Sequence, residues 1–122
     1  MLNILVIDDD EFFRETLAHI LQKEGYKVTE SNDAFNALAL LERSRPDLVF
    51  ADIFMPNMNG MEFIMELSKR DNNMPVIAMS GGRHSSTSLY NLESAKLLGA
   101  KVTLTKPFTL VELRKALVLA LA

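Results

Sequence analysis

The chain has no cysteine and no tryptophan, and only five glycines and four prolines occur among its 122 residues. The absence of cysteine excludes a disulfide framework, a thiol nucleophile and a cysteine-ligated zinc site. No apolar run approaches the roughly 18 residues that a membrane-spanning helix needs, and the opening MLNILVIDDD lacks the basic segment of a signal peptide. A reducing compartment suits a chain without cysteine, and we expect a cytoplasmic protein with no membrane span.

Basic charge is also scarce. The 13 basic residues are spread thinly against 16 acidic ones, so the net charge is −3, and no basic patch of the kind that binds a nucleic acid backbone is present in the sequence. Hydrophobic residues make up 48% of the chain, which is enough for one core in a domain of this length. We therefore expect a single domain over residues 1–122 that does not bind nucleic acid.

Short apolar runs alternate along the chain with longer amphipathic stretches, which predicts alternating strands and helices. The runs at 3–7, 48–51 and 76–79 have the continuous apolar character of strands that are buried on both faces. The segment 27–31 is polar and indicates an edge strand, and a fifth strand is expected at 102–105. The sequence thus predicts an α/β fold, a doubly wound parallel sheet of five strands with helices on both faces.

Five helices are expected, one after each strand. The first has an apolar face that begins at Phe13, and Gly25 is well placed to end it, while the second covers 34–44. Asn59 is the candidate N-cap of the third, and the fourth is expected at 89–98, after a loop that starts at Ser80.

The last predicted helix begins with a capping box formed by Thr109 and Glu112. Val118 and Leu119 lie outside its apolar stripe, which favours a contact surface on this helix. The expected stripe consists of Leu110, Leu113, Leu117 and Leu121.

Chemically useful side chains follow four of the five predicted strands. They should meet, because the ligand site of such a sheet lies beyond the carboxyl ends of its strands. Clustered carboxylates repel one another, and an oxygen-seeking cation such as Mg²⁺ relieves that repulsion. A lysine and a hydroxyl can contact a phosphoryl group, so the set suits phosphoryl transfer to a carboxylate. The residues are Asp8, Asp9 and Asp10 after the first strand, Asp52 after the third, Ser80 after the fourth and Lys106 after the fifth.

Each of these residues also has an ordinary structural interpretation. Asp10 is well placed to cap the first helix, and Asp52 alone can belong to a turn. Ser80 can be a plain loop residue and Lys106 a solvated lysine ahead of a turn. No single residue is specific, and the functional interpretation depends on their joint placement at the strand ends.

Four motifs in the same order give the chain a resemblance to the receiver domains of two-component response regulators. They are ILVIDDDE at 4–11, DLVFADIFMPNMNG at 47–60, PVIAMSGG at 75–82 and LTKPF at 104–108. Together they cover nearly the whole chain. The resemblance implies a flavodoxin-like sheet in the strand order 2-1-3-4-5.

The resemblance also implies a phosphorylation site and a metal site. Asp52 is the expected phosphoacceptor, with Asp8 and Asp9 as an acidic pair. Asp9, Asp52 and the backbone carbonyl of Phe54 are expected to hold Mg²⁺ directly, and Asp8 through water.

The hydroxyl and lysine positions of the family correspond to Ser80 and Lys106, and the Lys106–Pro107 peptide is expected to be cis. The family often has an aromatic switch residue on the fifth strand. In this sequence that position is Thr103, so a large ring that moves with Ser80 is not available.

The function implied is that of a signalling domain. A histidine kinase or phosphotransfer protein would donate a phosphoryl group to Asp52, and the chain would change conformation. The output would be contact with a downstream protein or a self-dimer through the fourth and fifth helices. Such a chain catalyses only its own phosphorylation and slow autodephosphorylation, so we do not expect an enzyme.

Two alternatives remain open at this point. A pseudo-receiver would bind a partner without being phosphorylated. An aspartyl phosphohydrolase dependent on Mg²⁺ would use a D-x-D-x-T/V signature at the first strand. Asp8 and Asp10 fit the first two positions of that signature, but Phe12 does not fit the last.

Overall fold

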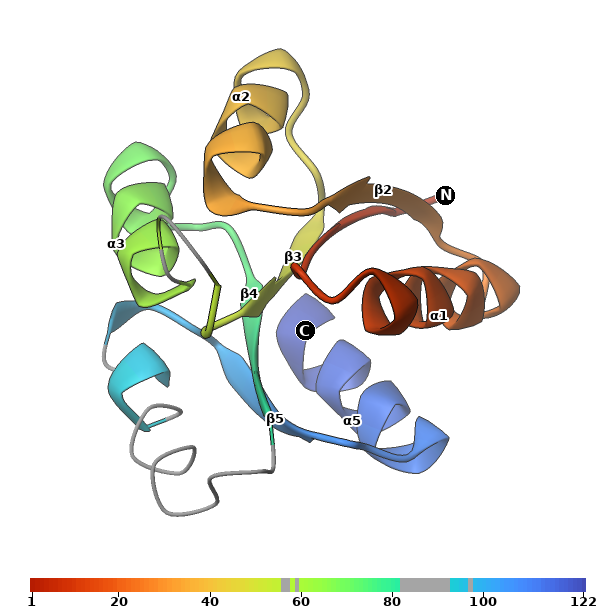
Figure 1. Cartoon of the computed structure of the whole chain (residues 1–122). Helices are drawn as coiled ribbons and strands as arrows, with labels where there is room; N and C mark the ends of the chain where they lie inside the picture. Colours follow the sequence, from red (N-terminus) through yellow and green to blue (C-terminus); the bar gives the residue numbers. More distant parts are fainter. Residues whose placement is uncertain (56–57, 59, 82–92, 97) are drawn as a thin grey trace.

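Strands and helices alternate along the chain, as the computed structural model in Figure 1 shows. The structure describes residues 1–55, 58, 60–81, 93–96 and 98–122. The strands are β1 (Asn3–Ile7), β2 (Lys27–Ser31), β3 (Leu48–Asp52), β4 (Val76–Gly81) and β5 (Val102–Lys106). The helices are α1 (Glu11–Lys23), α2 (Ala34–Arg43), α3 (Gly60–Arg70) and α5 (Leu110–Leu121).

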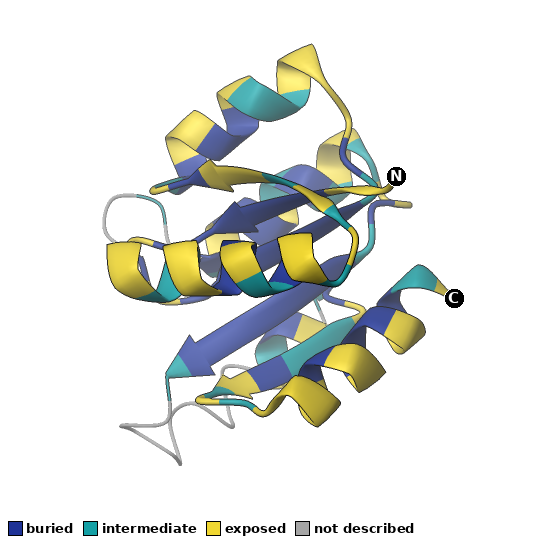
Figure 2. Ribbon diagram, turned by 90° about the vertical axis from the view of Figure 1, so that its right-hand side faces the viewer, coloured by how far each residue is buried: buried dark blue, intermediate teal, exposed yellow. Residues whose placement is uncertain are grey.

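The five strands form one parallel sheet in the order β2-β1-β3-β4-β5, which confirms the expected topology. Every residue of the central strand β3 is buried. The polar strand β2 lies at an edge, as its sequence predicts. The strands run as a mostly buried layer between partly exposed helices in Figure 2.

Helices cover both faces of the sheet and divide the core into two clusters. Leu5 and Ile7 of β1 pack with residues of α2 and α3, and Ile4 and Val6 pack with residues of α1 and α5. This alternation follows from the two-residue period of a strand. Among the described residues, no helix is both long and apolar enough to cross a membrane.

The helix ends depend on local polar contacts that the sequence predicts. The Asp10 carboxylate accepts a hydrogen bond from the Phe13 N–H and caps α1. Gly25 follows the end of this helix with a φ of 99°, in the left-handed region that favours glycine. Thr109 and Glu112 form the expected capping box at the start of α5.

Three strands run further toward the site than the sequence predicts. β4 continues through Ser80 and Gly81, which pair with Thr105 and Lys106 of β5, so the prediction that a loop begins at Ser80 is wrong. Asp52 and Lys106 likewise belong to strands, as the last residues of β3 and β5. Pairing with a neighbouring parallel strand therefore places Asp52, Ser80 and Lys106 on regular strand backbone.

Some predictions fall on parts of the chain that are not described. The candidate N-cap Asn59 and residues 82–92 lie outside the described residues. Residues 93–96 and 98 are helical and lie within the predicted fourth helix.

The buried stripe of α5 differs from the prediction. Leu110 is 43% exposed, although the pattern of leucines placed it on the core face. Helical side chains tilt toward the N-terminus, so a side chain on the first helical residue projects past the helix end. Leu113 and Leu117 are buried as predicted, and Leu121 is partly buried against the same cluster. Ala116 and Ala120 complete the buried stripe.

Gly60, the first residue of α3, lies against the end of β3. A Cβ atom built on Gly60 would clash with the Cα of Ile53 and with the backbone carbonyl oxygen of Asp52. The Gly60 N–H donates a hydrogen bond of 3.2 Å to the Ile53 carbonyl. Only a residue without a side chain allows α3 to approach the strand that carries Asp52.

We expect Gly60→Ala to destabilise the protein by about 1–3 kcal/mol, because the added methyl group displaces backbone atoms. This cost exceeds the gain in helix propensity, which is at most about 1 kcal/mol. Gly81→Ala is the matched control, since a Cβ on Gly81 meets no atom of the described residues within 4 Å. Urea unfolding measures both variants. Equal stabilities would contradict the close approach at Gly60.

Candidate functional site

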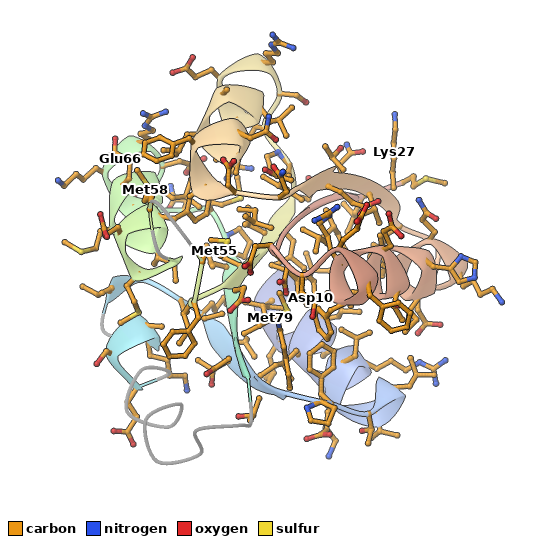
Figure 3. All side chains as sticks on the ribbon, in the orientation of Figure 1. Asp10, Lys27, Met55, Met58, Glu66 and Met79 are labelled. Atoms are coloured by element: carbon orange, nitrogen blue, oxygen red, sulfur yellow. The ribbon has the colours of Figure 1, made fainter. Side chains whose placement is uncertain are left out.

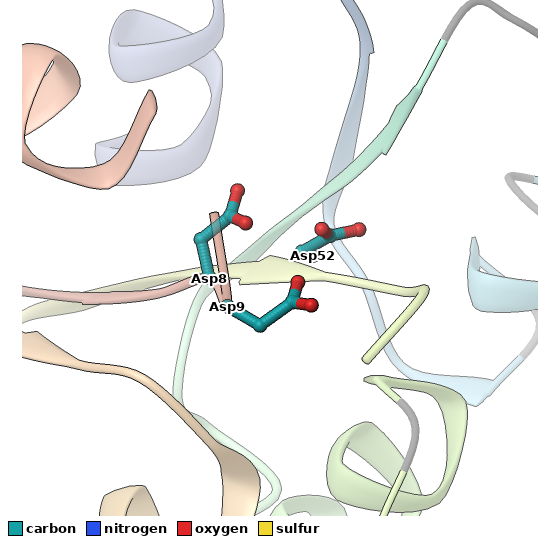
Figure 4. A group of neighbouring side chains, drawn as sticks. All are labelled: Asp8, Asp9 and Asp52. Carbon is teal, nitrogen blue, oxygen red and sulfur yellow. The ribbon is translucent and has the colours of Figure 1, made fainter. Parts of the chain in front are cut away.

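Three carboxylates meet at the carboxyl ends of β1 and β3. Asp8 and Asp9 follow β1, Asp52 ends β3, and the two strands are neighbours in the sheet. One oxygen from each side chain lies within 4.8 Å of the others, and Figure 4 shows the three groups gathered at this edge. Asp8 and Asp52 are buried, whereas Asp9 is exposed.

The Lys106 side chain, from the end of β5, joins two of these carboxylates. Its Nζ donates hydrogen bonds of 2.6 Å to Asp8 Oδ2 and 3.2 Å to Asp52 Oδ2. The ammonium and both carboxylates are largely shielded from water, so each attraction is stronger than it is for an exposed pair. One positive charge then faces two buried negative charges and the exposed Asp9.

Asp8 has further partners that fix it in place. Its Oδ1 accepts a hydrogen bond of 2.9 Å from the Asp10 N–H, and its own N–H donates to the Ser31 carbonyl at the end of β2. The Arg14 guanidinium donates to the Asp8 carbonyl at 2.9 Å. Asp10, at the start of α1 and near the middle of Figure 3, therefore caps a helix and is tied to the site by its backbone.

Burial raises the pKa of Asp52 to about 6. A hydrogen bond of 2.9 Å from the Phe54 N–H to Asp52 Oδ1 lowers the pKa, the charge of Asp8 raises it, and Lys106 lowers it. For Lys106 itself, burial lowers the pKa, but the hydrogen bond to Asp8 and the charge of Asp52 together raise it above its ordinary value. Lys106 is therefore an ammonium at neutral pH, and the Asp52 carboxylate is largely ionised.

Ser80 lies on β4, which pairs with β3 in the sheet. It directly follows Met79, which is labelled in Figure 3. Ser80 is fully buried, and its Oγ has no hydrogen-bond partner among the described residues. A buried hydroxyl without a partner costs free energy, so such a group is explained by a ligand or a water that completes it.

The structure thus brings together Asp8, Asp9, Asp52 and Lys106, as the sequence predicts. The Lys106–Pro107 peptide is cis, which is also as expected. The role of the Phe54 carbonyl as a ligand stays a prediction.

One contact at the site was not predicted from the sequence. The ring of Phe13 lies beside Lys106, with 4.1 Å between Nζ and the ring centroid. The apolar periodicity of α1 places Phe13 on the core face, and no sequence pattern distinguishes a ring that packs in the core from one that packs on a cation.

A comparison with protein families accounts for this arrangement. The profile described as "Response regulator receiver domain" matches residues 4–118. This chain belongs to the response regulator receiver domain family. Receiver domains are signalling domains, which is the class of function that the resemblance implies.

Curated relatives support the same assignment for this receiver domain. It is 34% identical to "Response regulator MprA" of Mycobacterium leprae over 92% of this chain and 47% of that protein. It is also 34% identical to "Sporulation initiation phosphotransferase F" of Bacillus subtilis over 93% of this chain and 88% of that protein. The chain spans about half the length of the MprA relatives.

Solved structures agree in fold. NtrX from Brucella abortus in complex with ADP superposes with a TM-score of 0.89 at 33% identity, covering 98% of this chain and 27% of that one. The chemotaxis protein CheY4 of Vibrio cholerae superposes with a TM-score of 0.87 at 30% identity, covering 98% of both chains.

The raised pKa of Asp52 gives a pH-dependent prediction. Between its unfolded value near 3.8 and its folded value of about 6, the folded state holds a proton that the unfolded state has lost. Asp52 therefore contributes stability at low pH that disappears as the pH rises through 6. We expect Asp52→Asn, which stays neutral, to be more stable than the parent at neutral pH by about 1–3 kcal/mol.

This gain should shrink toward zero at about pH 4, because the parent carboxyl is then protonated as well. Thermal unfolding in the presence of a chelator, at neutral pH and at about pH 4, measures the difference. A stability gap that does not change with pH would contradict the raised pKa.

Proposed function

We propose that this receiver domain accepts a phosphoryl group on Asp52 in a Mg²⁺-dependent reaction and thereby changes its contacts with other proteins. The observation that carries the proposal is the buried Asp52 carboxylate, which shares the Lys106 ammonium with Asp8 and lies beside the exposed Asp9. A structural ion pair needs only one carboxylate for one lysine, whereas this site has an excess of negative charge.

The donor set fits Mg²⁺. Asp8, Asp9 and Asp52 offer hard carboxylate oxygens within 4.8 Å of one another, and the exposure of Asp9 leaves room for the waters that this ion retains. We assign direct ligation to Asp9, Asp52 and the Phe54 carbonyl, and contact through water to Asp8. When bound, Mg²⁺ neutralises charge on the carboxylates and on the phosphoryl oxygens.

The chain's own residues divide the remaining work. An Asp52 oxygen attacks the phosphorus of a donor phosphohistidine, a P–O bond forms while the P–N bond breaks, and the electron pair stays on the imidazole nitrogen. Lys106 already lies 3.2 Å from Asp52 Oδ2, so its ammonium is placed to pair with a phosphoryl oxygen. Ser80 Oγ, buried and without a partner among the described residues, is suited to donate to another.

The proposed donor is a histidine kinase or a phosphotransfer protein, in the cytoplasm. The proposed output is contact with a downstream protein or with a second copy, through the surface that includes α5. Val111, Val118 and Leu119 on that helix are between 60% and 71% exposed, and exposed apolar groups on one helix favour protein contact over nucleic acid.

Phosphorylation is tested with acetyl phosphate and Mg²⁺, followed by intact mass. We expect a gain of one phosphoryl group, about 80 Da, in the parent and none in Asp52→Asn. Absence of an adduct without release of phosphate would favour the pseudo-receiver. Phosphate release that persists in Asp52→Asn but is lost in Asp8→Asn would favour a phosphohydrolase.

Metal binding has a separate prediction. Mg²⁺ should raise the melting temperature, because the ion binds only the folded cluster. Asp9→Ala should abolish this gain, since it removes the exposed ligand without leaving a buried charge unpaired. The matched control is Asp10→Asn, which removes a neighbouring carboxylate and keeps the cap of α1. The assignment of Asp9 fails if the two variants respond to Mg²⁺ alike.

A further inference from the structure

The Lys106 ammonium has a third neighbour besides its two carboxylates. Its Nζ lies over the Phe13 ring, 4.1 Å from the centroid. This distance is well inside the roughly 6 Å within which a ring attracts a cation. The lysine comes from β5 and the ring from α1, so the contact joins segments far apart in the chain.

Phe13 is also tied to the site through its backbone. The Asp8 carboxylate accepts from the Asp10 N–H at 2.9 Å, and the Asp10 carboxylate accepts from the Phe13 N–H at 3.1 Å. The ring then contacts Lys106, which donates back to Asp8 at 2.6 Å. These four contacts form a closed cycle that begins and ends at the buried Asp8 carboxylate. Asp8 therefore contacts Lys106 directly and is linked through Asp10 to Phe13, the ring beside that lysine.

A second ring supports the first. Phe13 and Phe108 meet edge to face, with 5.8 Å between centroids and an interplanar angle of 84°. Phe108 is two residues beyond Lys106, and both rings pack against the cluster between the sheet and helices α1 and α5. The Phe13 ring is therefore held on two sides and cannot leave the lysine without losing a favourable aromatic contact.

We propose that Phe13 is a positioning residue for Lys106, which holds the ammonium beside Asp52 in readiness for the phosphoryl group. The inference rests on the proposed phosphorylation of Asp52. Lysine has a flexible four-carbon stem, and the shorter hydrogen bond draws it toward Asp8. A third attractive neighbour restricts the ammonium to positions from which it also reaches Asp52.

A ring is suited to this task for an electrostatic reason. Another carboxylate beside Lys106 would add negative charge to a cluster that already exceeds the charge of its lysine, and would repel an incoming phosphoryl group. A phenyl ring attracts the cation through its quadrupole and carries no formal charge. Phe13 thus positions Lys106 without competing for Mg²⁺ and without repelling the incoming phosphoryl group.

The test compares Phe13→Leu, which keeps apolar bulk and removes the ring, with Phe13→Tyr, which restores a ring. Phe12→Leu is the control, because Phe12 is the next residue on α1 and is 81% exposed. The first readout is the proton shift of the Lys106 Cε methylene, measured by NMR without any phosphodonor. We expect an upfield ring-current shift in the parent, Phe13→Tyr and Phe12→Leu, and its loss in Phe13→Leu.

The second readout is the rate of phosphorylation by acetyl phosphate at saturating Mg²⁺. We expect Phe13→Leu to be about fivefold slower, which corresponds to roughly 1 kcal/mol and is typical of a partly buried cation–π contact. Phe13→Tyr should return to within about twofold of the parent, and the Mg²⁺-dependent gain in melting temperature should persist in both variants. In a Lys106→Met background, Phe13→Leu should have no further effect, because the ring acts through the lysine.

The proposal is overturned if Phe13→Leu keeps the parent rate, or if Phe13→Tyr is as slow as Phe13→Leu, since the ring would then only fill space. It is also overturned if the Lys106 methylene shift is the same in all variants. A parent that takes up no phosphoryl group would refute the proposed function instead. The methylene shift would still decide whether Phe13 holds Lys106.

Discussion

Lys106 lies between two buried carboxylates, and the edge of the sheet where they meet depends on that charge. Without the ammonium, Asp8 and Asp52 would be like charges shielded from water, which costs several kcal/mol in a folded protein. With it, the cluster that includes Asp9 still has an excess of negative charge. The lysine compensates part of the buried negative charge, so the folded state tolerates the two carboxylates. The remaining negative charge favours the binding of a cation, and then of an anion whose charge the cation neutralises.

The strand order explains why so few residues suffice for this arrangement. Asp8 and Asp52 are adjacent because β1 and β3 are neighbours in the sheet. β5 lies two strands from β3, and the long side chain of Lys106 spans that distance to reach both carboxylates. The close approach of Gly60 to the end of β3 fixes the backbone that carries Asp52. The same sheet that buries the core therefore also sets the distances between the charges.

Much of this could be predicted from the sequence, for reasons that are local. A buried parallel strand has a continuous apolar pattern, and its carboxyl end is known once the pattern stops, so Asp8, Asp52 and Lys106 were expected to meet. The prediction was wrong where tertiary pairing extends an element, as in the last residues of β4, and where a small side chain fills a helix face, as with Ala116. The sequence predicts the face of α1 on which Phe13 lies, but its contact with a charged group depends on a partner 93 residues away in the chain.

The contact between Phe13 and Lys106 is more important because β5 has no aromatic ring at position 103. Position 103 holds a half-buried threonine opposite Ala78 of β4, so no ring there can follow a movement of the Ser80 hydroxyl. Among the described contacts of the Lys106 ammonium, those to Asp8 and Asp52 stay within the site, and the one to Phe13 leads out of it. From Phe13 the aromatic contact continues to Phe108, just ahead of the cap of α5. A displacement of the Lys106 ammonium would therefore change its contact with Phe13, whose ring packs with Phe108 against the cluster that α1 and α5 share.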